Sequence, residues 1–261
     1  MNTEKNKVAQ GRYYEIKSKG PLKGEIELSG AKNAATKQII ASLLTDEECV
    51  LENVPDILDT RLTMGMCHDV GSEFSFKNGV LKITTKKIKK PEISASYTGR
   101  NRVPILFFGP LLHRYGKAIV PVVGGDKIGK RPIDFHLNAL KKMGADIKKR
   151  DSKYIVRAKK LHGADIFLPF PSVGATENVL LCASLAEGRT IIRNAAIEPE
   201  IIDLMLVLQK MGAIIEIRSD RTFVIEGVKK LKGFKHRVIL DRTEAVSFAC
   251  AVVASGGDAF I

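Results

Sequence analysis

Two stretches of this sequence repeat one pattern, and the repeat decides the fold. Residues 29–76 read SGAKNAATKQIIASLLTDEECVLENVPDILDTRLTMGMCHDVGSEFSF, and residues 172–217 read SVGATENVLLCASLAEGRTIIRNAAIEPEIIDLMLVLQKMGAIIEI. Both run from a small-residue turn through an apolar helix, a short strand, an asparagine turn and a second helix to a glycine and a further strand. Residues 125–158, GDKIGKRPIDFHLNALKKMGADIKKRDSKYIVRA, repeat the second half of the unit. We therefore expect a chain built from repeated supersecondary units.

Three glycines mark the same place in each unit. Gly71, Gly144 and Gly212 each end a predicted helix, at intervals of about 70 residues. Glycine favours this position because it adopts the left-handed conformation at little cost. Helical periodicity alternates with β-branched runs such as TIIRNA and RTFVIEG, which is typical of a mixed α/β or α+β protein. We expect three units over residues 32–240 to pack their helices against one another, with the sheets outside, as one closed domain.

The two ends of the chain are predicted to lie outside this domain. Residues 1–11 are a polar tail, and residues 12–31 read as a hairpin that belongs elsewhere. Residues 241–261 begin a fourth unit but end on the apolar AFI after a Gly-Gly turn, so we expect a final strand without a partner. Residues 12–31 and 241–261 would form part of an incomplete second domain, in a chain truncated at its C-terminus.

Composition narrows the class of protein. With 261 residues, 44% of them hydrophobic, the chain can fill one large or two moderate cores. No apolar run approaches the ~20 residues of a membrane span, and the polar N-terminus lacks the apolar core of a secretory signal, so we expect a cytoplasmic protein. The cysteines are too scattered for a disulfide framework or a zinc site and are expected to be buried: Cys49, Cys67, Cys182 and Cys250.

Charge predicts an affinity for anions. The formal net charge is +13, which would attract phosphorylated metabolites, nucleic acid or an acidic membrane surface. Aromatic residues are only 6% of the chain and do not alternate with basic ones, unlike the stacking surfaces of single-strand binders. Nucleic acid is therefore not the expected partner.

Two local patterns suggest a site for a phosphate-bearing substrate. In SGAKNAA, Lys32 and Asn33 open a helix, where free N–H groups and the helix dipole favour an anion; the alternative is a solvated Lys32 and a capping Asn33. In GGDKIGKRPID, a glycine-rich loop carries Asp126 and Arg131, together with two lysines, as a lid would; the alternative is an ordinary surface turn. Arg102 and residues 172–174 also precede helical runs.

Taken together, seven strings match one family in order. SGAKNAA, LENVPDILD, GPLLHRYG, GGDKIGKRPID, SVGAT, NAAIEPEIIDL and LDRTEA make the chain resemble the UDP-N-acetylglucosamine 1-carboxyvinyltransferases from about Tyr13 to its last residue. The Lys-Asn opening favours this family over enolpyruvylshikimate phosphate synthase, which has Lys-Ser. The resemblance implies an inside-out α/β barrel of the enolpyruvyl transferase type, with two domains of three repeats and the active site between them.

The resemblance also implies the reaction and the residues. Enolpyruvyl would pass from phosphoenolpyruvate to the 3′-hydroxyl of UDP-N-acetylglucosamine with release of phosphate, the first committed step of peptidoglycan synthesis, on which cell shape and division depend. No cofactor and no metal is implied. Asp126 and Lys32 would be catalytic, and phosphoenolpyruvate would contact Lys32, Asn33 and Arg131. The residues expected at the UDP-sugar are Arg102, Arg131, Pro132, Ile133, Asp134, Phe135, Ser172, Val173 and Gly174.

Three departures from the family pattern bear on activity. Asp126 stands where the family most often has a cysteine general acid, which predicts insensitivity to fosfomycin, an epoxide that alkylates that thiol. Val123 replaces the proline at the start of the loop, and Phe170 replaces a lysine before SVG.

Two other hypotheses stay open: a transferase acting on shikimate phosphate, and a non-catalytic basic binding protein that kept the scaffold. The sequence leaves the oligomeric state open.

Overall fold

The computed structural model describes residues 15, 17, 20–124 and 132–261. Their contacts form two compact units. One is Ser29–Arg242, and the other combines the described residues before Ser29 with Thr243–Ile261. The first unit carries nearly all of the predicted site residues.

Within Ser29–Arg242, the same order of elements occurs three times: a helix, a strand, a second helix and a β-hairpin. The first repeat has α1 (Lys32–Ala41), η1 (Ser42–Leu44), β2 (Cys49–Glu52), α2 (Leu58–Val70), β3 (Glu73–Lys77) and β4 (Val80–Thr84). After η2 (Ala95–Tyr97), the second has η3 (Val103–Phe107), α3 (Phe108–Tyr115), β5 (Lys117–Pro121), α4 (Asp134–Lys142), β6 (Asp146–Arg150) and β7 (Lys153–Arg157). β8 (Asp165–Phe167) follows the second repeat. The third repeat has α5 (Val173–Ala183), β9 (Arg189–Arg193), α6 (Pro199–Lys210), β10 (Ile214–Ile217) and β11 (Phe223–Glu226), and β12 (Lys235–Arg237) follows it.

Each repeat forms one antiparallel sheet, and a segment that follows another repeat adds to this sheet in parallel. The antiparallel parts are β2-β4-β3, β5-β7-β6 and β9-β11-β10. In the third sheet β8 adds in parallel to β9, and in the second Glu92 forms a parallel bridge with Ile119. In the first sheet β12 adds in parallel to β2, with His236 opposite Leu51. β12 follows the third repeat and pairs with a strand of the first repeat, so the strand pairings connect the three repeats in a cycle.

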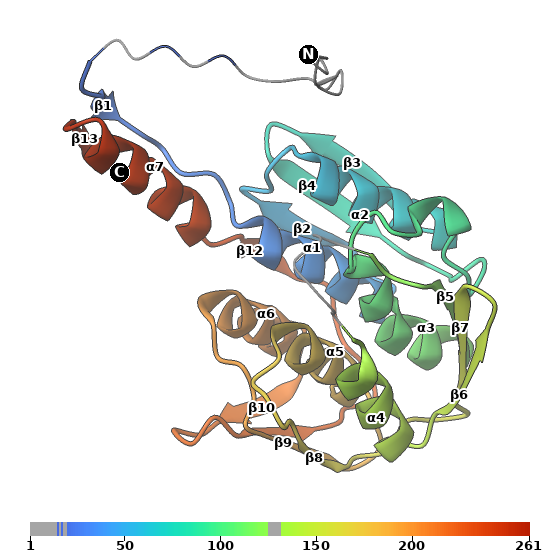
Figure 1. Ribbon diagram of the computed structural model, residues 1–261. Helices are drawn as coiled ribbons and strands as arrows, with labels where there is room; N and C mark the ends of the chain where they lie inside the picture. The colour runs from blue at the N-terminus through green and yellow to red at the C-terminus, as the bar shows by residue number, and fades with distance from the viewer. Residues whose placement is uncertain (1–14, 16, 18–19, 125–131) are drawn as a thin grey trace, which may run out of the picture. The chain divides into compact units, whose positions relative to one another are not determined.

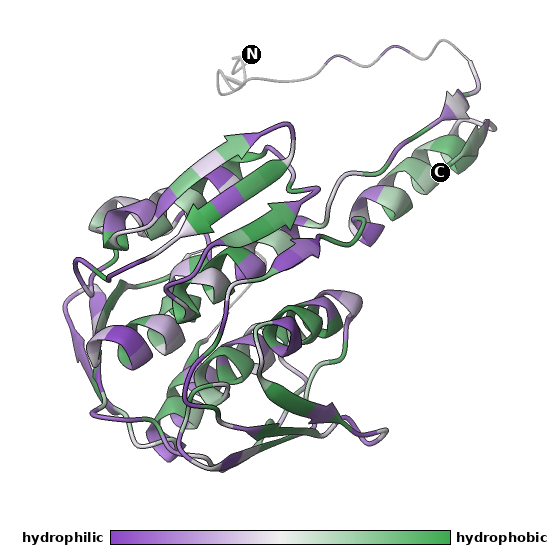
Figure 2. Ribbon diagram, turned by 180° about the vertical axis from the view of Figure 1, so that it is seen from behind, coloured by the Kyte–Doolittle hydropathy of each residue, from purple (hydrophilic) through white to green (hydrophobic). Residues whose placement is uncertain are grey.

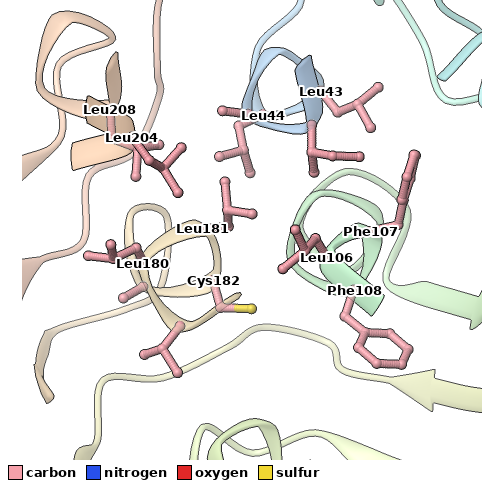
Figure 3. Close-up of a cluster of buried hydrophobic side chains, with 14 of the residues drawn as sticks. Leu43, Leu44, Leu106, Phe107, Phe108, Leu180, Leu181, Cys182, Leu204 and Leu208 are labelled. Carbon is pink, nitrogen blue, oxygen red and sulfur yellow. The ribbon is translucent and has the colours of Figure 1, made fainter. Parts of the chain in front are cut away.

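The helices lie inside and the sheets outside, as predicted. Figure 1 shows α1, α3, α5 and α6 between the three sheets. Leu43, Leu106, Phe108, Leu181 and Leu204, from five different helical segments, are buried in one cluster, which Figure 3 shows in close-up. Burying such side chains is the main favourable term in folding, on the order of 2 kcal/mol for each large apolar side chain. The mixed α/β class predicted from the repeat is therefore confirmed.

The glycines that marked the repeat do end its helices. Gly71, Gly144 and Gly212 have φ of 122°, 92° and 103°, values that side chains with a Cβ rarely adopt. After each one, the next amide donates to a carbonyl five residues back, from Ser72 to Cys67, Ala145 to Leu140 and Ala213 to Leu208, over 2.9, 3.0 and 2.9 Å. This bond satisfies a helix-end carbonyl that would otherwise lack a partner.

Two asparagines make the same bond in different repeats. Asn53 and Asn194 follow β2 and β9, with φ of 59° and 54°. Asn53 Nδ2 donates to the Val238 carbonyl at 3.1 Å, and Asn194 Nδ2 donates to the Leu168 carbonyl at 2.8 Å. Each bond ties the end of a strand to the segment that follows its parallel neighbour. At each asparagine turn predicted from the sequence, the asparagine side chain thus makes a hydrogen bond that joins two repeats.

The smaller unit corrects one expectation. The described part of residues 12–31 contains one strand, β1 (Lys23–Glu25), and it pairs in parallel with β13 (Asp258–Phe260). The expectation that the final strand lacks a partner is therefore wrong, whereas most of the first arm of the expected hairpin lies outside the described residues. A parallel partner far along the chain leaves no local turn signal.

The helix of this unit is exposed. α7 (Arg242–Ala254) has no buried residue, although Figure 2 shows that much of it is apolar. Its Cys250 is exposed, whereas Cys49, Cys67 and Cys182 are buried, so the expectation of buried cysteines fails at Cys250 alone. Within the described ranges, no helix is both long enough and apolar enough to span a bilayer.

Candidate active site

Lys32 is held at the start of α1 by acidic side chains from other segments. Its ammonium nitrogen lies 2.8 Å from Oδ2 of Asp59, in the first turn of α2. The other Asp59 oxygen accepts a hydrogen bond from Asn101 Nδ2 at 3.2 Å. The Lys32 amide donates to Asp241 Oδ2 at 3.4 Å. The lysine is therefore fixed, yet 46% of its side chain remains exposed to a ligand.

The carboxylate of Asp59 stays charged beside Lys32. Burial raises the pKa of Asp59, but the hydrogen bonds from Lys32 and Asn101 outweigh burial and bring the pKa below its usual value. The N-cap of α1 is Ala31, which offers no side-chain bond to the first turn, and Asn33 is exposed in that turn. A helix start with amide donors and an adjacent ammonium is a site that favours an anion.

A second cluster surrounds Arg102. Its Nη2 donates to the Pro132 carbonyl at 3.1 Å, and the amide of Gly124 donates to the Asn101 carbonyl at 3.3 Å. Gly124 and Pro132 flank residues 125–131, so both flanks contact the short segment 101–102. Asp126 and Arg131, predicted to be a general acid and a substrate contact, lie outside the described residues.

The segment after Pro132 leads into α4. Pro132 and Asp134 are exposed, Phe135 is half-buried and Ile133 is buried. Ile133 is also the N-cap of α4. Its side chain therefore packs in the core rather than facing a ligand, and a contact with the UDP-sugar would have to come from its backbone.

The start of α5 lies against α4. Ser172 is the N-cap and its Oγ accepts from the Ala175 amide at 3.4 Å. A Cβ at Gly174 would come within 3.3 Å of His136 Cε1, so the two helices approach closely here. Burial, together with the charge of Arg102, lowers the pKa of His136 to about 3. His136 is thus neutral, and its Nδ1 lies 3.3 Å from Asn178 Nδ2.

The described residues predicted for the site therefore fall at three helix starts. The starts of α1, α4 and α5 carry Lys32, residues 132–135 and residues 172–174. Asn101 contacts Asp59, the partner of Lys32, and Arg102 contacts Pro132. Phe170 is 67% exposed just before α5. Sequence reasoning missed Asp59, Asp241 and His136. Asp59 and Asp241 do stand inside the motifs LENVPDILD and LDRTEA, but their contacts with Lys32 span 27 and 209 residues.

The fold and these motifs agree with comparisons to known proteins. The model of the family EPSP synthase (3-phosphoshikimate 1-carboxyvinyltransferase) matches residues 16–261. The chain belongs to this family. Solved structures share its fold: the enolpyruvyl transferase NikO from Streptomyces tendae has a TM-score of 0.79 at 21% identity, covering 89% of this chain and 55% of that one. An EPSP synthase from Acinetobacter baumannii has a TM-score of 0.71 at 20% identity, covering 88% and 53%.

Curated relatives are nearer in sequence. UDP-N-acetylglucosamine 1-carboxyvinyltransferase of Protochlamydia amoebophila is 46% identical over 92% of this chain and 54% of its own length. The enzyme of the same name from Chlamydia pneumoniae is 47% identical over 93% and 54%. The resemblance read from the seven motifs is confirmed. The chain spans about half the length of these relatives.

Proposed function

We propose that this chain carries substrate-binding machinery for transferring enolpyruvyl from phosphoenolpyruvate to the 3′-hydroxyl of UDP-N-acetylglucosamine, with release of phosphate. The supporting observation is Lys32, held by Asp59 and still exposed, at the start of α1. This position suits the phosphate of phosphoenolpyruvate, since a fixed cation and amide donors both favour an anion. Asn33 beside it would orient the same substrate.

The reaction is an addition followed by an elimination. Protonation of the methylene carbon of phosphoenolpyruvate makes the adjacent carbon electrophilic, the sugar hydroxyl attacks that carbon, and loss of phosphate restores the double bond. Asp126 would supply the proton, and Lys32 and Arg131 would neutralise the substrate's negative charge. The UDP-sugar would lie along Arg102, residues 132–135 and residues 172–174.

The curated relatives, which are named UDP-N-acetylglucosamine 1-carboxyvinyltransferases, favour this sugar nucleotide. We infer from them a role in peptidoglycan synthesis, and hence in cell shape and division, carried out in the cytoplasm with two small-molecule substrates. Shikimate 3-phosphate is the second candidate, since the family model carries the name of that reaction. The Lys32-Asn33 opening argues against it.

Ligand binding by the chain tests the proposal. Calorimetric titration with UDP-N-acetylglucosamine, alone and with phosphoenolpyruvate, should show binding that shikimate 3-phosphate does not reproduce. Lys32→Met should weaken phosphoenolpyruvate binding about tenfold or more, since a charge-assisted contact contributes about 1.5–3 kcal/mol. Lys148→Met, which removes an exposed lysine on β6, is the matched control. Binding of shikimate 3-phosphate in place of the sugar nucleotide would overturn the assignment.

A further inference from the structure

Two residues of opposite charge occupy equivalent places in the first and third repeats. ATKQ at residues 35–38 of α1 corresponds to ATEN at residues 175–178 of α5. Thr36 Oγ1 donates to the Lys32 carbonyl at 2.9 Å, and Thr176 Oγ1 donates to the Ser172 carbonyl at 2.8 Å. Lys37 and Glu177 are the next residues, so each lies five positions after a residue assigned to ligand binding.

These two side chains meet inside the protein. Lys37 Nζ lies 3.8 Å from Glu177 Oε1, and the side chains are 13% and 2% exposed. Glu177 Oε1 has no hydrogen-bond partner among the described residues. The contact is therefore electrostatic, in a medium that screens charges less than water does.

The surroundings of Glu177 are acidic rather than neutralising. Glu198 and Glu200, at the start of α6, act on its charge along with Lys37. Arg242 binds Glu200 at 2.9 and 3.2 Å. The pKa of Glu177 is raised to about 7: burial is the largest cause, Lys37 opposes it, and Glu200 and Glu198 add to it.

We propose that Lys37 and Glu177 are a positioning pair, which fixes the N-terminal turns of α1 and α5 relative to each other and so sets the spacing between the phosphoenolpyruvate and UDP-sugar residues. The identity of the ligands rests on the proposed function, whereas the pairing of Lys37 with Glu177 does not depend on it. An ionised Glu177 costs folding free energy, since a buried ion pair is often no better than an apolar pair of the same volume. The site gains a fixed geometry at that cost, in the way that functional sites often trade stability for function.

Hydrogen exchange tests the pairing without any ligand. At pH 8, Glu177→Gln should reduce the protection factors of the amides of Ala34, Ala35, Ala175 and Thr176 about tenfold, with the interior of α3 unchanged. Lowering the pH of the unmodified protein to about 5.5 should have the same effect on these amides, because Glu177 then takes up a proton. Glu187→Gln, which removes a carboxylate from the exposed pair with Lys160, should change none of them.

A charge swap separates pairing from packing. Lys37→Glu combined with Glu177→Lys should restore the protection that Glu177→Gln loses, whereas Lys37→Met should not. Unchanged protection in Glu177→Gln at pH 8, or no rescue in the swapped protein, would overturn the positioning role.

Ligand titration then connects the pair to the site. In the unmodified protein, phosphoenolpyruvate should tighten UDP-N-acetylglucosamine binding, and Glu177→Gln should reduce that enhancement about fivefold at pH 8 while leaving phosphoenolpyruvate binding alone nearly unchanged. If the enhancement is the same in both proteins, the pair does not set the spacing. If the unmodified protein binds neither ligand while the exchange results hold, the proposed function fails and the pairing stands.

Discussion

The ammonium of Lys32 and the carboxylate of Asp59 lie 2.8 Å apart, although 27 residues separate them along the chain. The pair joins the start of α1 to the first turn of α2 and leaves the lysine accessible. Asn101 holds the other oxygen of Asp59 at 3.2 Å, which orients the carboxylate.

Asp59→Asn should weaken phosphoenolpyruvate binding. The amide keeps the shape of the carboxylate but no longer fixes the ammonium, so we expect about a tenfold loss of affinity by titration with only a small change in melting temperature. Asp56→Asn, which removes the carboxylate from the exposed pair with Arg61, is the control. Equal affinities in the two variants would show that Asp59 does not position Lys32.

Asp203 should be important for stability rather than binding. Its buried carboxylate accepts from Gln38 at 2.6 Å and contacts His236 Nε2 at 2.8 Å, so it links α1, α6 and β12. Asp203→Ala should lower the free energy of unfolding by about 3 kcal/mol, because buried partners lose their hydrogen bonds. Asp165→Ala, at the exposed pair with Arg193, should cost less than about 1 kcal/mol in the same urea titration.

Glu177 should make stability fall as pH rises towards neutrality. Its pKa is raised from 4.5 to about 7 in the folded protein, so the folded state binds a proton that the unfolded state releases between these values. The stabilisation is fully present below about pH 4.5 and is lost as pH rises through about 7. Between pH 5 and pH 8, Glu177→Gln should therefore gain up to about 3 kcal/mol relative to the unmodified protein.

Urea denaturation of both proteins at several pH values measures this difference. A difference that stays constant across the range would show that Glu177 titrates normally. The measurement also complements the hydrogen-exchange test, since the positioning role requires Glu177→Gln to retain stability at pH 8 while it loses protection at the two helix starts.

We propose that Asp126 stands in place of the thiol that fosfomycin alkylates, so the epoxide should not inactivate the protein. Asp126→Cys should create sensitivity, measured as one covalent adduct by mass spectrometry, with UDP-N-acetylglucosamine present to complete the site. The exposed Cys250 supplies the internal control, since peptide mapping must locate the adduct at residue 126. Stoichiometric modification of the unmodified protein would contradict the assignment of Asp126.

Local signals predicted much of the fold. Gly71, Gly144 and Gly212 located the helix ends because a left-handed residue is a local requirement. The pairing of β1 with β13 was not predictable, since parallel partners far apart need no turn between them. At the site, Lys32 was predictable from its place at a helix start. Its partners Asp59 and Asp241 were not, because only the tertiary fold brings them together.

The cyclic order of the repeats has a consequence for how the chain folds during synthesis. The sheet of the first repeat lacks an edge strand until β12 pairs with β2, and His236 lies opposite Leu51, which is 185 positions earlier in the chain. Until residues 235–237 leave the ribosome, the edge of β2 stays open to other strands, which is a recognised route to aggregation. The pairing of β12 with β2 closes a large loop, and the entropy of that loop is lost before the new contacts compensate for it. This slows folding. The first repeat to be synthesised is therefore the last to be completed.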